Sequence, residues 1–395
     1  MSSAARLSSG RMPAVLSHGF RLFFFAAALW SAVALALWLG MYVHGAALPS
    51  RFAPLAWHSH EMLFGFVMAA IAGFLLTAIP NWTHRLPVSG WPLLLLFGCW
   101  LLGRVACTVS ALIPAWLSIV VDLAFPVALV AVAAREIVAG RNWRNLPMIV
   151  PISVLGVANL LMHLEAAEVA VPPGTGWRLG LAGVLILISI VGGRIVPSFT
   201  RNWLAKRPGA ALPGTVGWID RLAVATLLAG LLFWAFLPDS RVVGLLLLLA
   251  AFVNLARLLR WRGWATFAEP LLLILHVGYG WLVIGTALLG ATVLDADLPQ
   301  AAAIHALTAG AAATMILAVM TRATRGHTGR DLTADRTTTL LYVLLTGAAV
   351  TRVVAGFGVG PILPLLVVSG GLWIAAFAGF ALAYGPMLLL PRPRR

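Results

Sequence analysis

The sequence predicts an all-α, polytopic membrane protein that crosses the bilayer twelve times. Three observations predict this class: 61% of the 395 residues are hydrophobic, only 10% are charged, and the mean hydropathy is +0.98. An ordinary soluble domain has about 25% charged residues, which cover its surface. The composition therefore excludes a soluble enzyme and a disordered chain. The net charge of +15 fits basic loops at a membrane surface, so no nucleic-acid partner is expected.

Twelve apolar segments are long enough to cross the hydrocarbon core, which takes about 20 helical residues. Their connections are short, so we expect one membrane domain, 1–395, with an uncleaved first span as its anchor. The predicted spans are 22–43, 59–79, 91–110, 112–134, 146–166, 179–199, 219–237, 242–260, 266–290, 301–321, 339–357 and 363–389.

The basic residues support this number of spans and orient the chain. If the N-terminus is cytoplasmic, twenty of the 27 Lys and Arg residues fall in inside segments, and only Arg51, Arg178 and Arg241 fall outside. Positive charge concentrates on cytoplasmic loops, and one missed helix would spoil the alternation. We therefore expect both termini in the cytoplasm.

The cytoplasmic ends of every fourth span share a short pattern. They read AIPNWTHR (78–85), IVPSFTRN (195–202) and VMTRATRG (319–326). Pro80, Pro197 and Thr321 share a column, which indicates three four-helix units around a pseudo-threefold axis. This layout is similar to the catalytic subunit of haem-copper oxidases, an analogy of fold only. The alternative is a general preference for Pro, Thr and Arg at helix ends.

Orientation places several histidines near the outer ends of spans. His58 and His60 enter the second span, His163 lies near the end of the fifth, and His305 lies about one turn inside the tenth. His276 is expected about 15 Å into the ninth span. Polar side chains inside spans are costly and usually functional, and imidazole is the commonest metal ligand.

Two of these histidines suit a haem. Bis-His ligation needs two helices that each present one imidazole at matched depth, and His60 and His305 meet that requirement. Arg104 and Arg352 lie near the outer ends of the third and eleventh spans, where they could pair with haem propionates. The alternative for each histidine is a hydrogen-bonded interfacial residue.

The remaining histidines are candidates for a second site. His58 points away from His60 on a regular helix, so both cannot bind one metal from it. His163 has Asn159 one turn earlier on the same face, and it is a candidate copper ligand, proton-path residue or packed polar residue. His276 is a candidate ligand or proton relay.

The acidic residues and cysteines within the spans are expected to have structural roles. Glu61 opens the second predicted span, where a carboxylate favours the helix dipole, with a metal or proton contact as the alternative. Asp122 and Asn254 lie deep in spans and are expected to fix helix packing. Cys99 and Cys107 form no CxxC motif and are expected to be small buried hydrophobes.

Four segments resemble the NnrS family over nearly the whole chain. They begin WHSHEMLFGF, GGRIVPSFTR, LHVGYGWLVI and HALTAGAAAT, and they cover 57–93, 192–204, 275–285 and 305–330. The resemblance implies a twelve-helix protein of the bacterial inner membrane that contains haem and copper and takes part in the response to nitric oxide and nitrosative stress. It places the family's histidine-bearing motifs on His58, His60, His276, His305 and His327.

The oxidase analogy has a limit, and other functions stay open. The oxidases carry copper-ligating histidines on helices 6 and 7, where this chain has none. One alternative is a secondary transporter whose polar site is Arg104, Asp122, Asn254 and His276. Another is an assembly factor that delivers haem or copper. The expected surroundings are the lipid bilayer and, for any redox or nitric oxide-handling activity, an electron donor.

Overall fold

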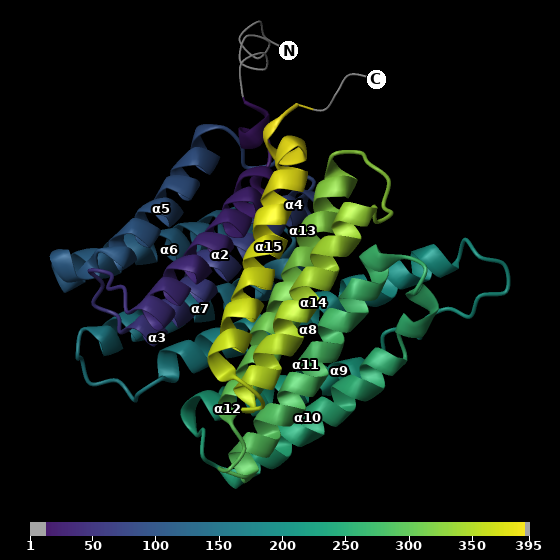
Figure 1. Cartoon of the computed structure of the whole chain (residues 1–395). Coiled ribbons are helices and arrows are strands. Elements are labelled where there is room, and N and C mark those ends of the chain that lie inside the picture. The colour runs from purple at the N-terminus through teal and green to yellow at the C-terminus, as the bar shows by residue number, and fades with distance from the viewer. Residues whose placement is uncertain (1–12, 392–395) are drawn as a thin grey trace, which may run out of the picture. The chain divides into compact units, whose positions relative to one another are not determined.

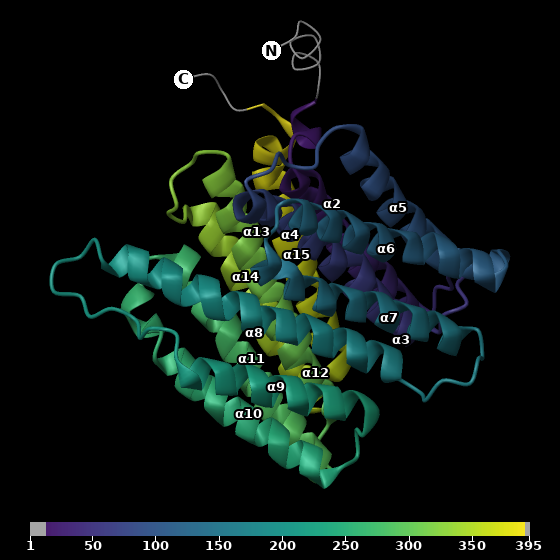
Figure 2. The same ribbon diagram turned by 180° about the vertical axis from the view of Figure 1, so that it is seen from behind.

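The computed structural model describes residues 13–391 (Figure 1 and, from behind, Figure 2). Over this range the chain consists of helices and connections, without strands. Twelve helices are long and apolar enough to cross a membrane, which confirms the predicted class and number of spans. The predicted cytoplasmic termini include residues 1–12 and 392–395, which lie outside the described residues. The orientation of the chain stays a prediction.

Several spans extend up to six residues beyond their predicted limits, because the helix continues past its most apolar stretch, while a few limits fall up to four residues short. They are Gly19–His44 (α2), Pro54–Thr83 (α3, η2, α4), Trp91–Thr108 (α5), Ala115–Ala139 (α6), Trp143–Ala166 (η4, α7), Thr175–Leu204 (α8), Trp218–Phe236 (α9), Arg241–Leu259 (α10), Pro270–Leu294 (α11), Gln300–His327 (α12, η6, α13), Arg336–Gly356 (α14) and Ile362–Leu389 (α15).

Contacts divide the chain into two compact units. The described part of the first unit comprises residues 13–170, 320–331 and 377–391. Within it α2 packs against α4, α5 against α6, and α6 against both α4 and α7. These are the purple and blue helices of Figure 1. Arg21 of α2 binds the C-terminal end of α15: its Nη1 donates to the carbonyls of Met387 and Leu388 at 3.1 Å.

The second unit comprises residues 171–319 and 332–376. In it α10 packs against α9 and α11, α8 packs against α9, and α12 packs against α14. The predicted single domain and the predicted three four-helix units both stay predictions.

Two spans contain a seven-residue π-helical segment, and each segment directly follows a histidine. Segment η2 (Glu61–Val67) separates α3 (Pro54–His60) from α4 (Met68–Thr83). Segment η6 (Ala306–Ala312) separates α12 (Gln300–His305) from α13 (Ala313–His327). Segments of this kind occur frequently at functional sites. The two histidines at these junctions, His60 and His305, are therefore candidate site residues.

Candidate metal centre

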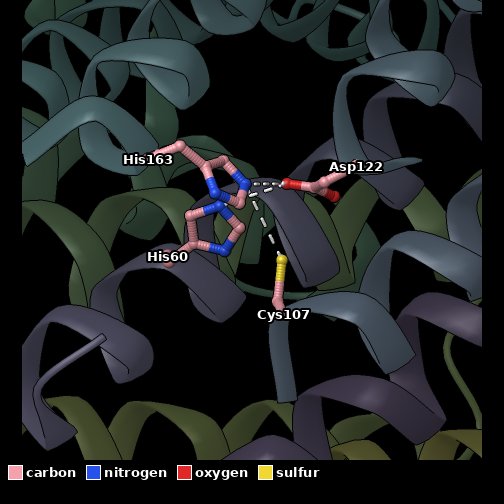
Figure 3. A group of neighbouring side chains, drawn as sticks. All are labelled: His60, Cys107, Asp122 and His163. Carbon is pink, nitrogen blue, oxygen red and sulfur yellow. Dashed lines mark hydrogen bonds and ion pairs between the residues drawn. The ribbon is translucent and has the colours of Figure 1, made fainter. Parts of the chain in front are cut away.

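Four side chains that can ligate a metal ion meet in the first unit. They are His60 of α3, Cys107 of α5, Asp122 of α6 and His163 of α7 (Ile149–Ala166). One ligand atom of each lies within 4.8 Å of all the others. Figure 3 shows the two imidazoles, the thiol and the carboxylate pointing toward one another. Each of these residues is at most 3% exposed.

The order of the spans explains why these residues share one end of the unit. His60 lies early in the second span, Cys107 at the end of the third, Asp122 early in the fourth and His163 near the end of the fifth. Consecutive spans run in opposite directions, so the start of one lies beside the end of the next. The sequence predicts that this end faces the outside of the cell.

The distances suit one small ion. Oδ2 of Asp122 lies 3.1 Å from Nε2 of His163 and 3.2 Å from Nε2 of His60. Sγ of Cys107 lies 3.9 Å from Nε2 of His163. Metal–nitrogen bonds of about 2.0 Å and metal–sulfur bonds of about 2.3 Å in a tetrahedron separate ligand atoms by about 3.3–3.5 Å. The group therefore fits a tetrahedral ion after small side-chain movements.

Glu61 holds the imidazole of His60 in place. Its Oε1 lies 3.0 Å from Nδ1 of His60. An ionised carboxylate only accepts hydrogen bonds, so Nδ1 carries the donated proton. In the neutral ring the lone pair then lies on Nε2, the atom that faces the cluster. Such carboxylate–histidine pairs commonly orient metal ligands.

Arg104 forms ion pairs with both carboxylates around the cluster. Its Nη1 lies 2.8 Å from both oxygens of Glu61, and its Nη2 forms an ion pair with Oδ1 of Asp122. This arrangement leaves Oδ2 of Asp122 toward the histidines. Asn159 also positions this oxygen, because its Nδ2 donates to it at 2.9 Å.

Two glycines make this arrangement possible. A Cβ on Gly103 would collide with Asp122, so only glycine lets α5 approach α6 at this level. A Cβ on Gly65 would lie 2.9 Å from Oε2 of Glu61 and would also strike the indole of Trp30. That indole donates to Oε2 of Glu61 at 2.8 Å. Gly65 thus leaves room for a third donor to the carboxylate.

Aromatic rings cover the cluster and exclude water. The ring centroid of Phe52 lies 4.7 Å from that of His60 and 5.1 Å from that of His163. The segment that carries Phe52 is tied to the end of α5, since Ser50 Oγ donates to the carbonyl of Cys107 at 2.8 Å. The next backbone amide, that of Arg51, donates to Ser110 at 2.8 Å.

The structure brings together some of the predicted site residues and separates others. His60, His163 and Arg104 belong to one cluster with Asn159, as the shared face of the fifth span predicts for Asn159 and His163. His58 instead stacks on Trp38, with ring centroids 4.4 Å apart. It is therefore not among the four clustered ligands, in line with the predicted divergence of His58 from His60.

His276, His305 and Arg352 lie in the second unit, whereas His327 lies in the first, with its ring centroid 5.4 Å from that of Phe20. Nε2 of His276 lies 2.9 Å from Oγ1 of Thr200. Because α11 begins at Pro270 rather than at 266, His276 lies only about 9 Å along its helix. Arg352 is half-buried on α14. His305 ends α12, and its Nδ1 donates to the carbonyl of Ala301 at 2.7 Å.

Two interpretations of the sequence need correction. Glu61 does not open a helix, because the span begins seven residues earlier at Pro54; it is fully buried and binds His60 and Arg104 instead. Cys107 is buried as predicted, but it is also one of the clustered ligand residues, which the lack of a CxxC motif concealed. Cys107 lies three residues after Arg104, on the same face of α5, and this spacing is the sequence feature that could have indicated its place beside the polar residues.

The polar residues of the transporter hypothesis fall into separate networks. Arg104 and Asp122 pair with each other in the first unit. In the second unit Asn254 accepts from the hydroxyl of Tyr279 at 2.6 Å, and that hydroxyl accepts from Arg257 at 3.0 Å. Among the described residues His276 is hydrogen-bonded to Thr200 and belongs to neither network.

The residues predicted to bind a haem differ in how well their surroundings suit one. Nε2 of His60 lies within the four-residue cluster, 3.2 Å from Oδ2 of Asp122, its Nδ1 is bound by Glu61, and Arg104 is held by two carboxylates. His60 and Arg104 therefore do not fit a haem in this arrangement. His305 fits better, because Nδ1 must donate to a carbonyl and the lone pair of the neutral ring then lies on Nε2.

The fold and this site define a class: a polytopic helical membrane protein with a buried group of nitrogen, oxygen and sulfur donors compatible with metal binding. The chain belongs to the NnrS protein family, whose sequence profile matches residues 14–392. This match confirms the resemblance seen in the sequence. No curated protein sequence matches the chain.

Proposed function

We propose that this protein binds a copper ion through His60, Cys107, Asp122 and His163, and that it acts at the bacterial inner membrane in the response to nitric oxide. One observation carries the proposal: four donors of the right types lie within 4.8 Å of one another in a buried site. Copper and nitric oxide are properties that the family resemblance implies.

The donor set favours a transition metal. Two imidazoles with one thiolate are a ligand combination that binds copper, while hard ions such as Mg²⁺ and Ca²⁺ prefer oxygen ligands. The buried site contains only one carboxylate among its four donors. Zinc accepts the same donors, so metal analysis of the protein distinguishes the two ions.

The charges around the cluster favour a divalent ion. Glu61 and Asp122 carry two negative charges and Arg104 one positive charge, all with 1% exposure or less. A divalent ion bound to the thiolate of Cys107 adds one net positive charge, which brings the group to neutrality. Uncompensated charge inside a membrane is costly, so this balance stabilises the bound state.

The chain's own groups orient the ligands and keep the site dry. Glu61 fixes His60 through Nδ1, Arg104 fixes Asp122 through Oδ1, and Phe52 covers both imidazoles. A bound copper ion would supply one-electron chemistry at this place. Hydrogen-bonded supporting groups of this kind tune the affinity and potential of a metal site.

A haem, if present, is proposed to use His305. Its tautomer suits ligation, and it stands directly before the π-helical segment η6, as His60 stands before η2. Arg352 stays the proposed partner of a propionate. Because Nε2 of His60 serves the metal cluster and its Nδ1 is bound by Glu61, the sixth ligand of this haem is not assigned to His60.

Metal analysis of the purified protein tests the proposal. We expect about one copper ion per chain after expression with added copper, and a large loss in Cys107→Ser and His163→Ala. His58→Ala is the matched control, because His58 lies two residues from His60 and outside the cluster. Nitric oxide, added without oxygen, should change the copper resonance of the wild type and of His58→Ala, but not of the variants that lose copper.

Three outcomes would contradict the proposal. A preparation without transition metal after copper-supplemented expression would remove the metal site. Metal that leaves rapidly to an acceptor protein, without any response to nitric oxide, would favour an assembly factor. Transport of a solute by metal-free vesicles would favour the transporter.

A further inference from the structure

A second polar site lies at the opposite end of the first unit from the metal cluster. A cavity of about 510 Å³ opens where α4 ends, α5 begins and α6 ends; its lining includes His84, Arg85, Ser89, Arg135 and Glu136. A water molecule occupies about 30 Å³ in the liquid, so the cavity has room for a group of many atoms.

One buried carboxylate holds two arginines beside this cavity. Arg85 Nε lies 2.7 Å from Oε2 of Glu136, and Arg135 Nη2 lies 2.7 Å from Oε1 of the same side chain. The side chain of Glu136 is 8% exposed, whereas those of Arg85 and Arg135 are 45% and 64% exposed. The two guanidinium groups are thus fixed near each other at an open surface.

This arrangement is suited to an anion. Each guanidinium has five N–H donors, and the two oxygens of Glu136 accept only part of the ten. Arg85, Arg135 and Glu136 together carry a net charge of one positive. Arginine binds phosphate oxygens through paired N–H donors, so a singly charged phosphodiester would satisfy both the charge and the remaining donors.

The place of the cavity indicates the source of that phosphate. Thr83 ends one span, Trp91 begins the next, and Ala139 ends a third, so the cavity lies where the apolar helices stop. Leu86 and Trp91 flank it with 89% and 75% exposure. An exposed leucine and tryptophan at this depth suit acyl chains and the membrane interface.

We propose that Arg85 and Arg135, fixed by Glu136, bind the phosphate of an anionic phospholipid headgroup at the membrane surface. This end of the unit is the predicted cytoplasmic one, where basic pockets between spans bind anionic lipids. The site is separate from the proposed metal function and does not depend on it.

Lipid selectivity in nanodiscs tests this proposal. The full-length protein is placed in bilayers of phosphatidylcholine and phosphatidylglycerol, and spin-labelled forms of each lipid report their relative affinities. We expect Arg85→Gln/Arg135→Gln to lower the selectivity for phosphatidylglycerol at least about threefold. The matched control is Arg141→Gln/Arg144→Gln, which removes two exposed charges close to the same end but outside the cavity lining.

Glu136→Gln distinguishes binding by two positioned arginines from general electrostatic attraction of anionic lipid to a positive surface. This change makes the surface one charge more positive but releases the two arginines. If positioned arginines bind the lipid, Glu136→Gln lowers the selectivity for phosphatidylglycerol. If surface charge alone attracts it, the same change raises the selectivity. Equal melting temperatures and a single peak in size-exclusion chromatography establish that each variant is folded.

Three results would overturn the proposal. The first is an equal loss of selectivity in the Arg141→Gln/Arg144→Gln control. The second is higher selectivity in Glu136→Gln. The third is displacement of the labelled phosphatidylglycerol by inorganic phosphate at constant ionic strength, which would indicate a soluble phosphate compound instead of a lipid.

Discussion

Nδ1 of His60 lies 3.0 Å from Oε1 of Glu61, although the two residues are neighbours in the chain. In a regular α-helix adjacent side chains do not face each other. Here the contact occurs where α3 passes into the π-helical segment η2. Glu61 also accepts from Arg104 and Trp30, so one carboxylate connects the second span to the third and the first.

Glu61→Gln is expected to weaken metal binding by about 10–100-fold, because outer carboxylates orient ligating histidines. Competition with a chelator of known affinity measures the change. Glu168→Gln, in the loop after α7, is the control and should bind metal as the wild type does. An affinity of Glu61→Gln within twofold of the wild type would show that His60 is not a ligand or needs no orientation.

Arg104→Met is expected to reduce the free energy of unfolding by about 3–5 kcal/mol, because it leaves two buried carboxylates without their cation. Thermal or denaturant unfolding in detergent measures this loss. The triple variant Arg104→Met/Glu61→Gln/Asp122→Asn removes all three charges and should recover much of it. Equal stability of the single and triple variants would contradict the assigned ion pairs.

Gly65→Ala is expected to destabilise the protein by about 1–3 kcal/mol, since the added methyl group meets Trp30 and Glu61 in a packed interior. It should also lower the metal content. Gly98→Ala on α5 is the control, because a Cβ there has nothing within 4 Å. This control should be neutral or more stable by up to about 1 kcal/mol. A harmless Gly65→Ala would refute the close contact.

Absorption spectra separate the two proposed cofactor sites. His305→Ala is expected to lose the haem absorption band and keep copper, whereas His60→Ala should lose copper and keep the haem band. The reason is that Nδ1 of His60 is bound by Glu61 and its Nε2 faces the metal cluster, while His305 has a tautomer suited to a haem. Loss of the haem band in both variants would instead support the bis-His pair that the sequence predicts.

The membrane fold follows from local sequence, and the site does not. Runs of apolar residues identify all twelve spans because each helix must satisfy its own backbone in lipid. Asn159 and His163 could be paired from the sequence because they lie one turn apart on one helix. The π-helical segments were not predicted, because no simple periodicity marks them.

Contacts between spans decide the rest of the site. Cys107 resembles any small apolar residue in its segment until α6 and α7 bring Asp122 and His163 to it. Glu61 resembles a helix-start residue because the preceding residues 54–60 are less apolar than the span, yet they are helical. Gly103 has a role only because α6 passes close to it.

Phe52 belongs to a short segment, 50–52, in which Ser50 donates to the backbone carbonyl of Cys107, the residue that contributes the sulfur. Moving this segment aside to admit a hydrophilic chelator would therefore also displace Cys107. Such an arrangement would make the release of a bound ion to the outside slow, whatever the affinity.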